Sequence, residues 1–495
     1  MKKVVNWFKN IYQKIKNFFV KVDGGIDNGV NKVTNKFSNF WTKYNFVFFL
    51  GIFTVLALVL KYCLVKTPSG DYVTFLQPWT YYMGENGGFV KGLVNLYSLE
   101  NTTSVFFEGI GFNKNVYLCD YQPLYMYFLS FFSILPMGEA ITTSSYSSYH
   151  FYENLIYYIK TLSFVFEIIF AIYAFKIVKK VTNSKTASCT AYALILILPT
   201  VVINGSMWGQ CDACYASMVC ASVYYLMDKK QIRSMIFFGL ALAFKLQVVF
   251  ILPSFGFAWF RKSFKLRYFL VAFATTFLTF LPLWCAGASF TLPFMPYVRQ
   301  LTGYSSSINL NSTSMYAIFM WNSITNGSDI KALSTFGMVF TVICSFVLIS
   351  TLAMKRVKVT YKSLFTIATF SVLMVPFVMP HMHDRYFYLA ETFLVMYACT
   401  KLNRIHLPIM QQVSGLLAYS CYGIIQPNWF LNDKNGQQIA LCTGALLNMG
   451  SLGFLIYDLA HLETEPKPER IEEIAEKETS SVEENTDENN LKGED

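Results

Sequence analysis

Apolar runs long enough to cross a lipid bilayer recur along this chain, and short clusters of Lys and Arg separate them. The first run, residues 45–65, has the ~20 residues that an α-helix needs to span hydrocarbon. Of the 495 residues, 54% are hydrophobic and only 14% are charged. One soluble core cannot bury that much apolar surface, so the sequence predicts an all-α polytopic membrane protein.

The net charge of +10 comes from basic residues gathered near the N-terminus and in the loops between apolar runs. Cytoplasmic loops of membrane proteins carry such an excess of Lys and Arg. We therefore read these residues as cytoplasmic anchors rather than as a nucleic-acid surface. Both termini are expected inside, and the Lys-, Asn- and Phe-rich usage favours a bacterial plasma membrane.

Two terminal segments differ from the membrane domain, which we place at residues 46–460. Residues 1–45 alternate apolar and basic positions at helical spacing, which predicts an amphipathic helix on the anionic cytoplasmic leaflet. Residues 461–495 are Glu-rich with almost no apolar residues, which is typical of a disordered tail.

The positive-inside pattern decides the path of the chain. It predicts about twelve crossings, with long external loops at about 66–154 and 287–333. Residues 121–136 are apolar but short. If they crossed, the basic residues from Lys176 to Lys185 would lie outside, so we expect this segment in the outer interface. The stretch 235–260 has basic residues at both ends, so it must go out and back, with Lys245 at its tip.

With this topology, unusual polar groups from six separate segments fall at the outer membrane face. They are Asp71, Asp120, Trp208 with Gln210 and Asp212, Lys245 with Gln247, Arg299, and the run His383-Asp384-Arg385. Ionisable groups are costly at this depth and are usually functional. A carboxylate there, such as Asp71, is placed to take a proton from a sugar hydroxyl while a lipid substrate stays in the bilayer.

Each of these groups also has an ordinary structural explanation. Asp71 is suited to cap the helix that follows it, and Asp120 with Tyr121 and Gln122 has the same option before Pro123. Lys245 has a stem long enough to snorkel, and Arg299 is equally well explained as a loop arginine. The His383-Asp384-Arg385 cluster is harder to explain in this way, because three titratable groups need both solvation and partners.

Three motifs resemble signatures of the GT-C superfamily of polyprenyl-phosphate-sugar-dependent glycosyltransferases. They are Gly70-Asp71-Tyr72 with Trp79 downstream, Asp120-Tyr121-Gln122-Pro123-Leu124, and His383-Asp384-Arg385. The pattern is most similar to the dolichyl-phosphate-glucose glucosyltransferases, which read G-D-Y, D-Y-P-P-L and H-E-K. Trp208-Gly209-Gln210-Cys211-Asp212 and Phe244-Lys245-Leu246-Gln247 look like bacterial patterns. The departures are Gln122 in place of proline and Asp384-Arg385 in place of Glu-Lys.

The resemblance implies an inverting transfer of one sugar from a polyprenyl-phosphate donor to a glycan or glycolipid, with Asp71 as the catalytic base. Lys245, Arg385 and Arg299 are then expected at the donor phosphate, where cations stabilise the charge that develops. The expected substrate-binding residues are Asp120, Tyr121, Trp208, Gln210, Asp212, Gln247, His383 and Asp384. No cofactor is expected, since a divalent ion between Asp71 and Asp120 is only weakly indicated.

Two other functions fit the same composition. A transporter or flippase of lipid-linked saccharides would line a path through the membrane with polar groups, whereas these gather on one face. A lipid-to-polymer glycan ligase would use a diphosphate-linked oligosaccharide, and only a comparison of donors separates it from a monophosphate-sugar enzyme.

Overall fold

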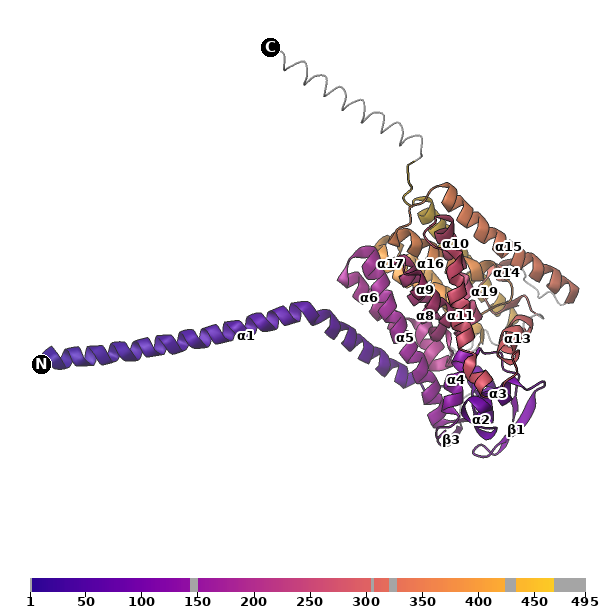
Figure 1. Ribbon diagram of the computed structural model, residues 1–495, viewed down its shortest axis with the longest axis horizontal. Helices are drawn as coiled ribbons and strands as arrows, with labels where there is room; N and C mark the ends of the chain where they lie inside the picture. Colours follow the sequence, from indigo (N-terminus) through magenta and orange to yellow (C-terminus); the bar gives the residue numbers. More distant parts are fainter. Residues whose placement is uncertain (1, 143–149, 304–306, 320–326, 423–432, 467–495) are drawn as a thin grey trace, which may run out of the picture. The chain divides into compact units, whose positions relative to one another are not determined.

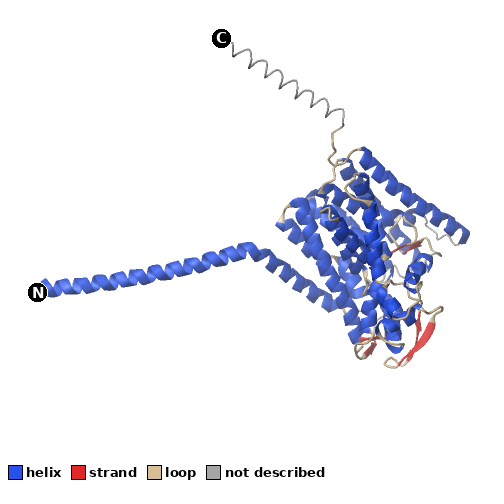
Figure 2. Ribbon diagram, in the orientation of Figure 1, coloured by secondary structure: helices blue, strands red, loops and turns tan. Residues whose placement is uncertain are grey.

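The computed structural model describes residues 2–142, 150–303, 307–319, 327–422 and 433–466, and it is almost entirely helical (Figure 2). The chain divides into two units, Met1–Leu56 and Ala57–Asp495. The first unit is part of one continuous helix, α1 (Lys2–Leu64), which runs through the predicted boundary at residue 45. The second unit holds every other element (Figure 1).

Helices cover most of the second unit. In chain order after α1 they are η1 (Tyr72–Leu76), α2 (Gln77–Glu85), α3 (Phe89–Tyr97), α4 (Pro123–Phe132), α5 (Glu153–Thr182), α6 (Lys185–Ile197), α7 (Pro199–Val202), η2 (Ile203–Trp208), α8 (Asp212–Met227), α9 (Gln231–Phe244), η3 (Leu246–Ile251), α10 (Leu252–Phe260), η4 (Leu266–Tyr268), α11 (Phe269–Leu278), α12 (Leu281–Cys285), η5 (Leu292–Phe294), α13 (Met295–Gly303), α14 (Met315–Phe319), α15 (Gly327–Met354), α16 (Tyr361–Val378), α17 (Tyr388–Thr400), η6 (Leu402–Arg404), α18 (His406–Tyr422) and α19 (Lys434–Ala460).

Strands occur only as short pairs among the described residues. The segment between α1 and α5, predicted to be the first external loop, contains two antiparallel hairpins, β1 (Thr103–Phe107) with β2 (Phe112–Val116), and β3 (Ala140–Thr142) with β4 (His150–Tyr152). A third pair, β5 (Asn309–Leu310) with β6 (Met382–His383), is parallel and joins segments far apart in sequence. The helices of the first external loop were expected, but the two hairpins were not.

The prediction of a polytopic all-α membrane protein is confirmed. Six described helical segments are long and apolar enough to cross a bilayer, and the bent pair 185–197 and 199–208 makes a seventh. Twelve predicted crossings exceed this number because several of the predicted runs form helices shorter than a full span. For example, α8, α17 and α18 have only 16, 13 and 17 residues.

Two expected short segments are present in the second unit. The apolar stretch after Tyr121 forms α4, a helix of only 10 residues. A helix rises about 1.5 Å per residue, so α4 is too short to span hydrocarbon. The stretch 235–260 breaks where α9 ends at Lys245, whose backbone is extended. This break gives the predicted interruption in the apolar run.

The long helices carry different groups at their two ends. Elements α2, α3, β1 and β3 lie together at the lower end of the second unit in Figure 1. Helix α8 begins at Asp212 and ends beside Asp228, which pairs with Lys180 near the end of α5. Past the end of α17, Lys401 pairs with Asp458. Basic loops therefore lie at the opposite helix ends from Asp212.

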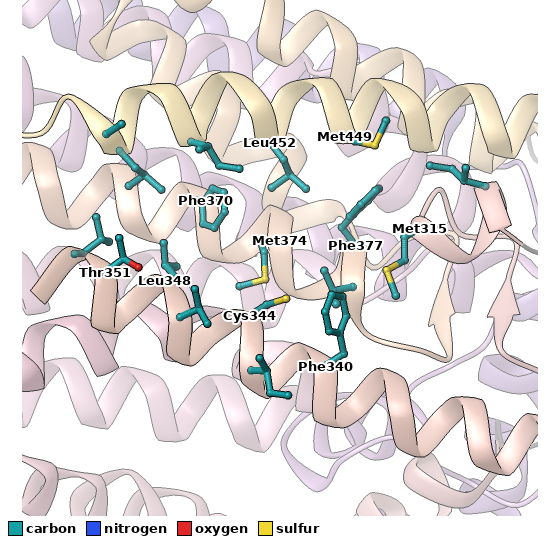
Figure 3. A pocket seen from close by; sticks show the side chains of 18 of the residues that line it. Met315, Phe340, Cys344, Leu348, Thr351, Phe370, Met374, Phe377, Met449 and Leu452 are labelled. Carbon is teal, nitrogen blue, oxygen red and sulfur yellow. The ribbon is translucent and has the colours of Figure 1, made fainter. Parts of the chain in front are cut away.

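Helices α15, α16 and α19 line an apolar groove of about 610 Å³. Phe340 and Cys344 from α15, Phe377 from α16, and Leu452 from α19 contribute to its walls (Figure 3). All three helices are candidate membrane spans. A surface of this kind is suited to hydrocarbon chains rather than to water.

Candidate active site

Asp71 directly follows the loop after α1 and has helical backbone angles, with φ −62° and ψ −38°. Its side chain makes no hydrogen bond that caps the following helix. Ser69 does this instead, because its Oγ accepts a hydrogen bond from the Tyr72 amide at 3.1 Å. The helix-cap explanation of Asp71 is therefore wrong, and its carboxylate is directed to other partners.

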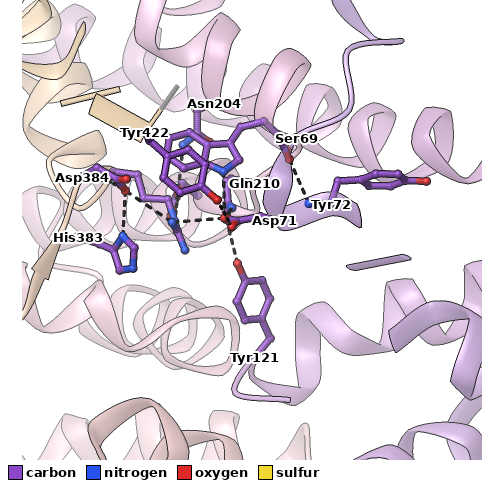
Figure 4. A network of polar contacts seen from close by, with 12 residues as sticks. Ser69, Asp71, Tyr72, Tyr121, Asn204, Gln210, His383, Asp384 and Tyr422 are labelled. Atoms are coloured by element: carbon purple, nitrogen blue, oxygen red, sulfur yellow. Dashed lines mark hydrogen bonds and ion pairs between the residues drawn. The ribbon is translucent and has the colours of Figure 1, made fainter. Parts of the chain in front are cut away.

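Three side chains donate hydrogen bonds to the Asp71 carboxylate (Figure 4). Trp208 Nε1 and Gln210 Nε2 donate to Oδ2 at 3.0 and 2.5 Å, and Tyr422 donates to Oδ1. Tyr121 extends the network by donating to Gln210 Oε1 at 2.9 Å. Burial raises the pKa of Tyr121 well above its usual value, so its hydroxyl keeps the proton that it donates.

Both segments that meet at this carboxylate include an irregular helix. A π-helical turn, η1, starts directly after Asp71, and a second, η2, ends at Trp208. Single π-turns within helical segments often occur at functional sites. Gly209 then takes the left-handed conformation, with φ +78°, which favours glycine. This turn places Trp208 and Gln210 on the same carboxylate oxygen.

Trp208 packs between aromatic and cationic groups. The Tyr422 ring stacks on it with centroids 4.6 Å apart, and the Tyr419 ring meets it edge-on at 5.2 Å. The Arg385 guanidinium lies over the indole at 5.4 Å, a distance typical of cation–π contacts. Trp208 is fully buried, so these contacts fix the indole that donates to Asp71.

The short parallel pair β5 and β6 positions the His383-Asp384-Arg385 cluster. The Asp384 amide donates to the Leu310 carbonyl at 3.0 Å, and the Asp384 side chain accepts from the Arg385 amide at 2.9 Å. His383 Nδ1 lies 3.0 Å from Asp384 Oδ1. Hydrogen bonding to a second segment thus holds the cluster, as its three titratable groups require.

Arg385 lies at the centre of the charged groups. Its Nη1 lies 3.6 Å from Asp71 Oδ2, and its Nε lies 3.9 Å from Asp212 Oδ2. These contacts are longer than hydrogen bonds, and the buried Nε has no hydrogen-bond partner among the described residues. Burial alone would lower the pKa of this guanidinium, but Tyr121 and the surrounding carboxylates outweigh it and raise that pKa well above its usual value.

Lys245 belongs to a separate buried ion pair. Its Nζ lies 2.5 Å from Asp212 Oδ1, and Asn204 donates to Asp212 Oδ2 at 2.9 Å. The ammonium also lies about 6 Å from the rings of Tyr121 and Tyr386. Lys245 is thus close to the network but neutralised by a carboxylate.

A cavity of about 580 Å³ opens beside Asp71. Of the predicted site residues, Asp71, Asp120, Tyr121, Arg299, His383 and Arg385 line it. Arg299 donates to the carbonyl oxygens of Cys119, Tyr97 and Leu99, so its guanidinium also holds the cavity wall. Lys245 and Gln247 are buried and do not line this cavity.

Several residues of the network were not predicted. Tyr422 lies in an apolar run and has no local signal in the sequence, whereas Asn204 directly follows an apolar run as the first residue of an Asn-Gly-Ser sequon. Lys160 Nζ donates to the carbonyl oxygens of Val65, Thr67 and Met207, and Glu167 pairs with Lys61. A signal for these last residues existed, because ionisable side chains inside an apolar run are rare.

Metal binding has little support in the described part of the chain. No group of three or more His, Cys, Asp or Glu residues there is placed to hold a metal ion. The expectation that no cofactor is used stays a prediction.

The model of glycosyltransferase family 87, a GT-C-type family, matches residues 119–380, more than half of the chain. The match covers the segments of Asp120, Trp208 and Lys245 but neither Asp71 nor Arg385. No curated protein matches. The predicted GT-C relationship is confirmed by the family match.

Proposed function

Because the chain belongs to glycosyltransferase family 87, we propose that it transfers a single hexose from a polyprenyl-phosphate donor to a glycan or glycolipid at the non-cytoplasmic membrane face. The observation that carries this proposal is the cavity wall where Asp71 and Arg385 lie 3.6 Å apart. A carboxylate serves as a proton acceptor, and an adjacent cation serves an anionic leaving group.

The proposed reaction uses these groups in one displacement. The acceptor hydroxyl gives its proton to Asp71, and its oxygen forms a bond to the anomeric carbon of the donor sugar. The bond from that carbon to the phosphate oxygen breaks, and the electron pair leaves with the polyprenyl phosphate. Attack from the opposite side inverts the anomeric configuration. The three hydrogen bonds to Asp71 fix the orientation of its carboxylate before the substrates bind.

Two features support a lipid phosphate as the leaving group. Arg385 lines the cavity, so its guanidinium is within reach of an anion that binds there. Val378, at the end of α16, lines the apolar groove, and Arg385 follows in the next loop. A lipid-linked donor needs both a cation for its phosphate and apolar surface for its chain.

The position of the site supports a single membrane face. Asp71, the start of α8 and the loop before α17 come together around Arg385, whereas basic clusters lie past the other ends of α5, α8 and α17. Basic loops are characteristic of the cytoplasmic side. The same one-sided arrangement argues against a transporter, whose polar groups would continue through the membrane.

A deletion strain tests the proposal directly. We expect cells lacking this protein to accumulate one polyprenyl-phosphate hexose, and the wild-type gene, but not the Asp71→Asn gene, to remove it. Membranes of that strain, supplied with the radiolabelled form of the accumulated lipid, then provide the transfer assay. Accumulation of a diphosphate-linked oligosaccharide instead would favour the ligase, and accumulation of neither lipid would contradict the proposal.

A further inference from the structure

Helix α5 carries three buried polar side chains on one face inside a candidate membrane span. Lys160, Ser163 and Glu167 are spaced by three and four residues, which places them on the same side of a helix. Each is at most 3% exposed. Charged groups are costly in a membrane-spanning helix, and they require specific partners.

Lys160 uses its ammonium to join two segments of the proposed site. It donates to the carbonyl oxygens of Val65 at 2.8 Å, Thr67 at 2.6 Å and Met207 at 3.1 Å. An ammonium has three donors, and here all three have a partner. Val65 and Thr67 belong to the loop that leads into Asp71, whereas Met207 directly precedes Trp208.

Ser163 and Glu167 contact the same two segments. Ser163 donates to the Gln210 carbonyl oxygen at 2.9 Å, and the Gln210 side chain donates to Asp71. Glu167 pairs with Lys61 of α1 at 2.5 Å. A Cβ added to Gly205 would lie 2.2 Å from Glu167 Oε1, so the carboxylate is pressed against the η2 backbone.

We infer that Lys160, Ser163 and Glu167 form a positioning face, which sets the distance between Asp71 and its donors Trp208 and Gln210. None of the three lines the cavity, so they act through the backbone of the two segments. This inference rests on the proposed role of Asp71. In this inference the Lys160 ammonium keeps the base correctly positioned and does not bind substrate.

The main test compares Lys160→Met with Lys176→Met in the membrane transfer assay, using the full-length protein and the radiolabelled donor. Lys176 lies on the same helix but is exposed. We expect Lys160→Met to lower kcat ~10- to 100-fold with the donor KM within about threefold, since small misplacements of catalytic groups are that costly. Lys176→Met should match the wild type. An unchanged kcat, or a raised KM alone, would overturn the inference.

Ser163→Ala provides a second variant if Lys160→Met does not fold. It removes one hydrogen bond to the Gln210 carbonyl and little volume, so we expect normal folding and kcat lowered ~3- to 10-fold. A folded Ser163→Ala protein with wild-type kcat would overturn the inference.

A double-variant cycle separates positioning from general stability. If Ser163 acts through the Gln210 side chain, Ser163→Ala should lower kcat little further in a Gln210→Ala protein, because the donor that Ser163 positions is already lost although the carbonyl remains. Independent multiplication of the two effects would contradict this route. Asp71→Asn serves as the reference. If Asp71→Asn retains activity, the proposed base is refuted. If Asp71→Asn is inactive while the α5 variants have wild-type activity, only the positioning face is refuted.

Discussion

Tyr422 donates a hydrogen bond to Asp71 across 351 residues of sequence. The same Tyr422 ring stacks on Trp208, a second donor to that carboxylate. The C-terminal end of α18 therefore completes a network that begins just after the first membrane span. In the proposed mechanism this contact orients the base through Oδ1, the carboxylate oxygen that Gln210 does not contact.

Tyr422→Phe should lower transfer while leaving folding intact. The ring and its stacking remain, but one hydrogen bond to a charged group is lost, which is typically worth ~1.5–3 kcal/mol. We expect kcat to fall about 10- to 100-fold, measured in the membrane transfer assay with the radiolabelled donor. Tyr457→Phe, at an exposed position of α19, is the control and should be unaffected. Equal activities of the two variants would show that the Tyr422 hydroxyl is dispensable.

Asp71→Asn should abolish transfer without preventing donor binding. The amide keeps the size of the side chain but does not accept the proton at neutral pH, and general-base catalysis is typically worth ~10²- to 10⁴-fold. Binding of the labelled donor and transfer are measured separately on the same membranes. Asp120→Asn, which also lines the cavity, should be less severe. If Asp120→Asn abolishes transfer and Asp71→Asn does not, the two roles are exchanged.

Arg385 and Lys245 should respond differently to loss of charge. Arg385 lines the cavity, so Arg385→Met should weaken use of the donor by ~1.5–3 kcal/mol, seen as a raised KM and lowered kcat. Arg385→Lys should rescue this only in part, because the planar fork is lost. Lys245→Met removes the nearest cation from the buried Asp212 carboxylate, so it should chiefly lower thermal stability. A folded Lys245→Met protein with an Arg385-like defect would place Lys245 at the donor phosphate.

The features that could be predicted from the sequence are those that depend on composition and on the lengths of the apolar runs. The first crossing, the short α4 and the break at Lys245 all follow from where apolar runs stop. Convergence of Asp71, Trp208 and Gln210 was inferred from their common depth, and the structure places them in hydrogen-bond contact. The number of crossings was harder to predict from the sequence, because a bend inside an apolar run leaves little trace in its hydropathy.

The remaining site residues depend on tertiary contacts. Nothing around Tyr422 distinguishes it from Tyr419, the other tyrosine of its helix, and only the packing of α18 brings its hydroxyl to Asp71. Lys160 and Glu167 did stand out as charges within an apolar run. Their carbonyl and lysine partners, however, lie in the loop after α1, in η2 and at the end of α1, and register alone does not identify them.

The topology is tested by reporter fusions. A reporter placed after Lys180 should be cytoplasmic, because this residue follows a basic cluster at the end of α5. One placed between Ile308 and Asn311, next to β6, should be external. Two reporter enzymes score these positions, one that is active only in the cytoplasm and one that is active only outside. An external signal after Lys180 would mean that α4 contributes to a crossing and that the proposed side of the site is wrong.

Gly205 and Gly453 offer a matched test of the packing beside the network. A Cβ at Gly205 would lie 2.2 Å from Glu167 Oε1, whereas a Cβ at Gly453 on α19 meets nothing within 4 Å. We expect Gly205→Ala to lower the free energy of unfolding by ~1–3 kcal/mol, as overpacking does, and Gly453→Ala to be neutral or slightly stabilising. Both are measured by thermal unfolding of the detergent-solubilised protein. Adding Glu167→Asp to Gly205→Ala shortens the opposing side chain and should recover part of the loss. If the double variant is no more stable than Gly205→Ala, the contact with Glu167 is not its cause.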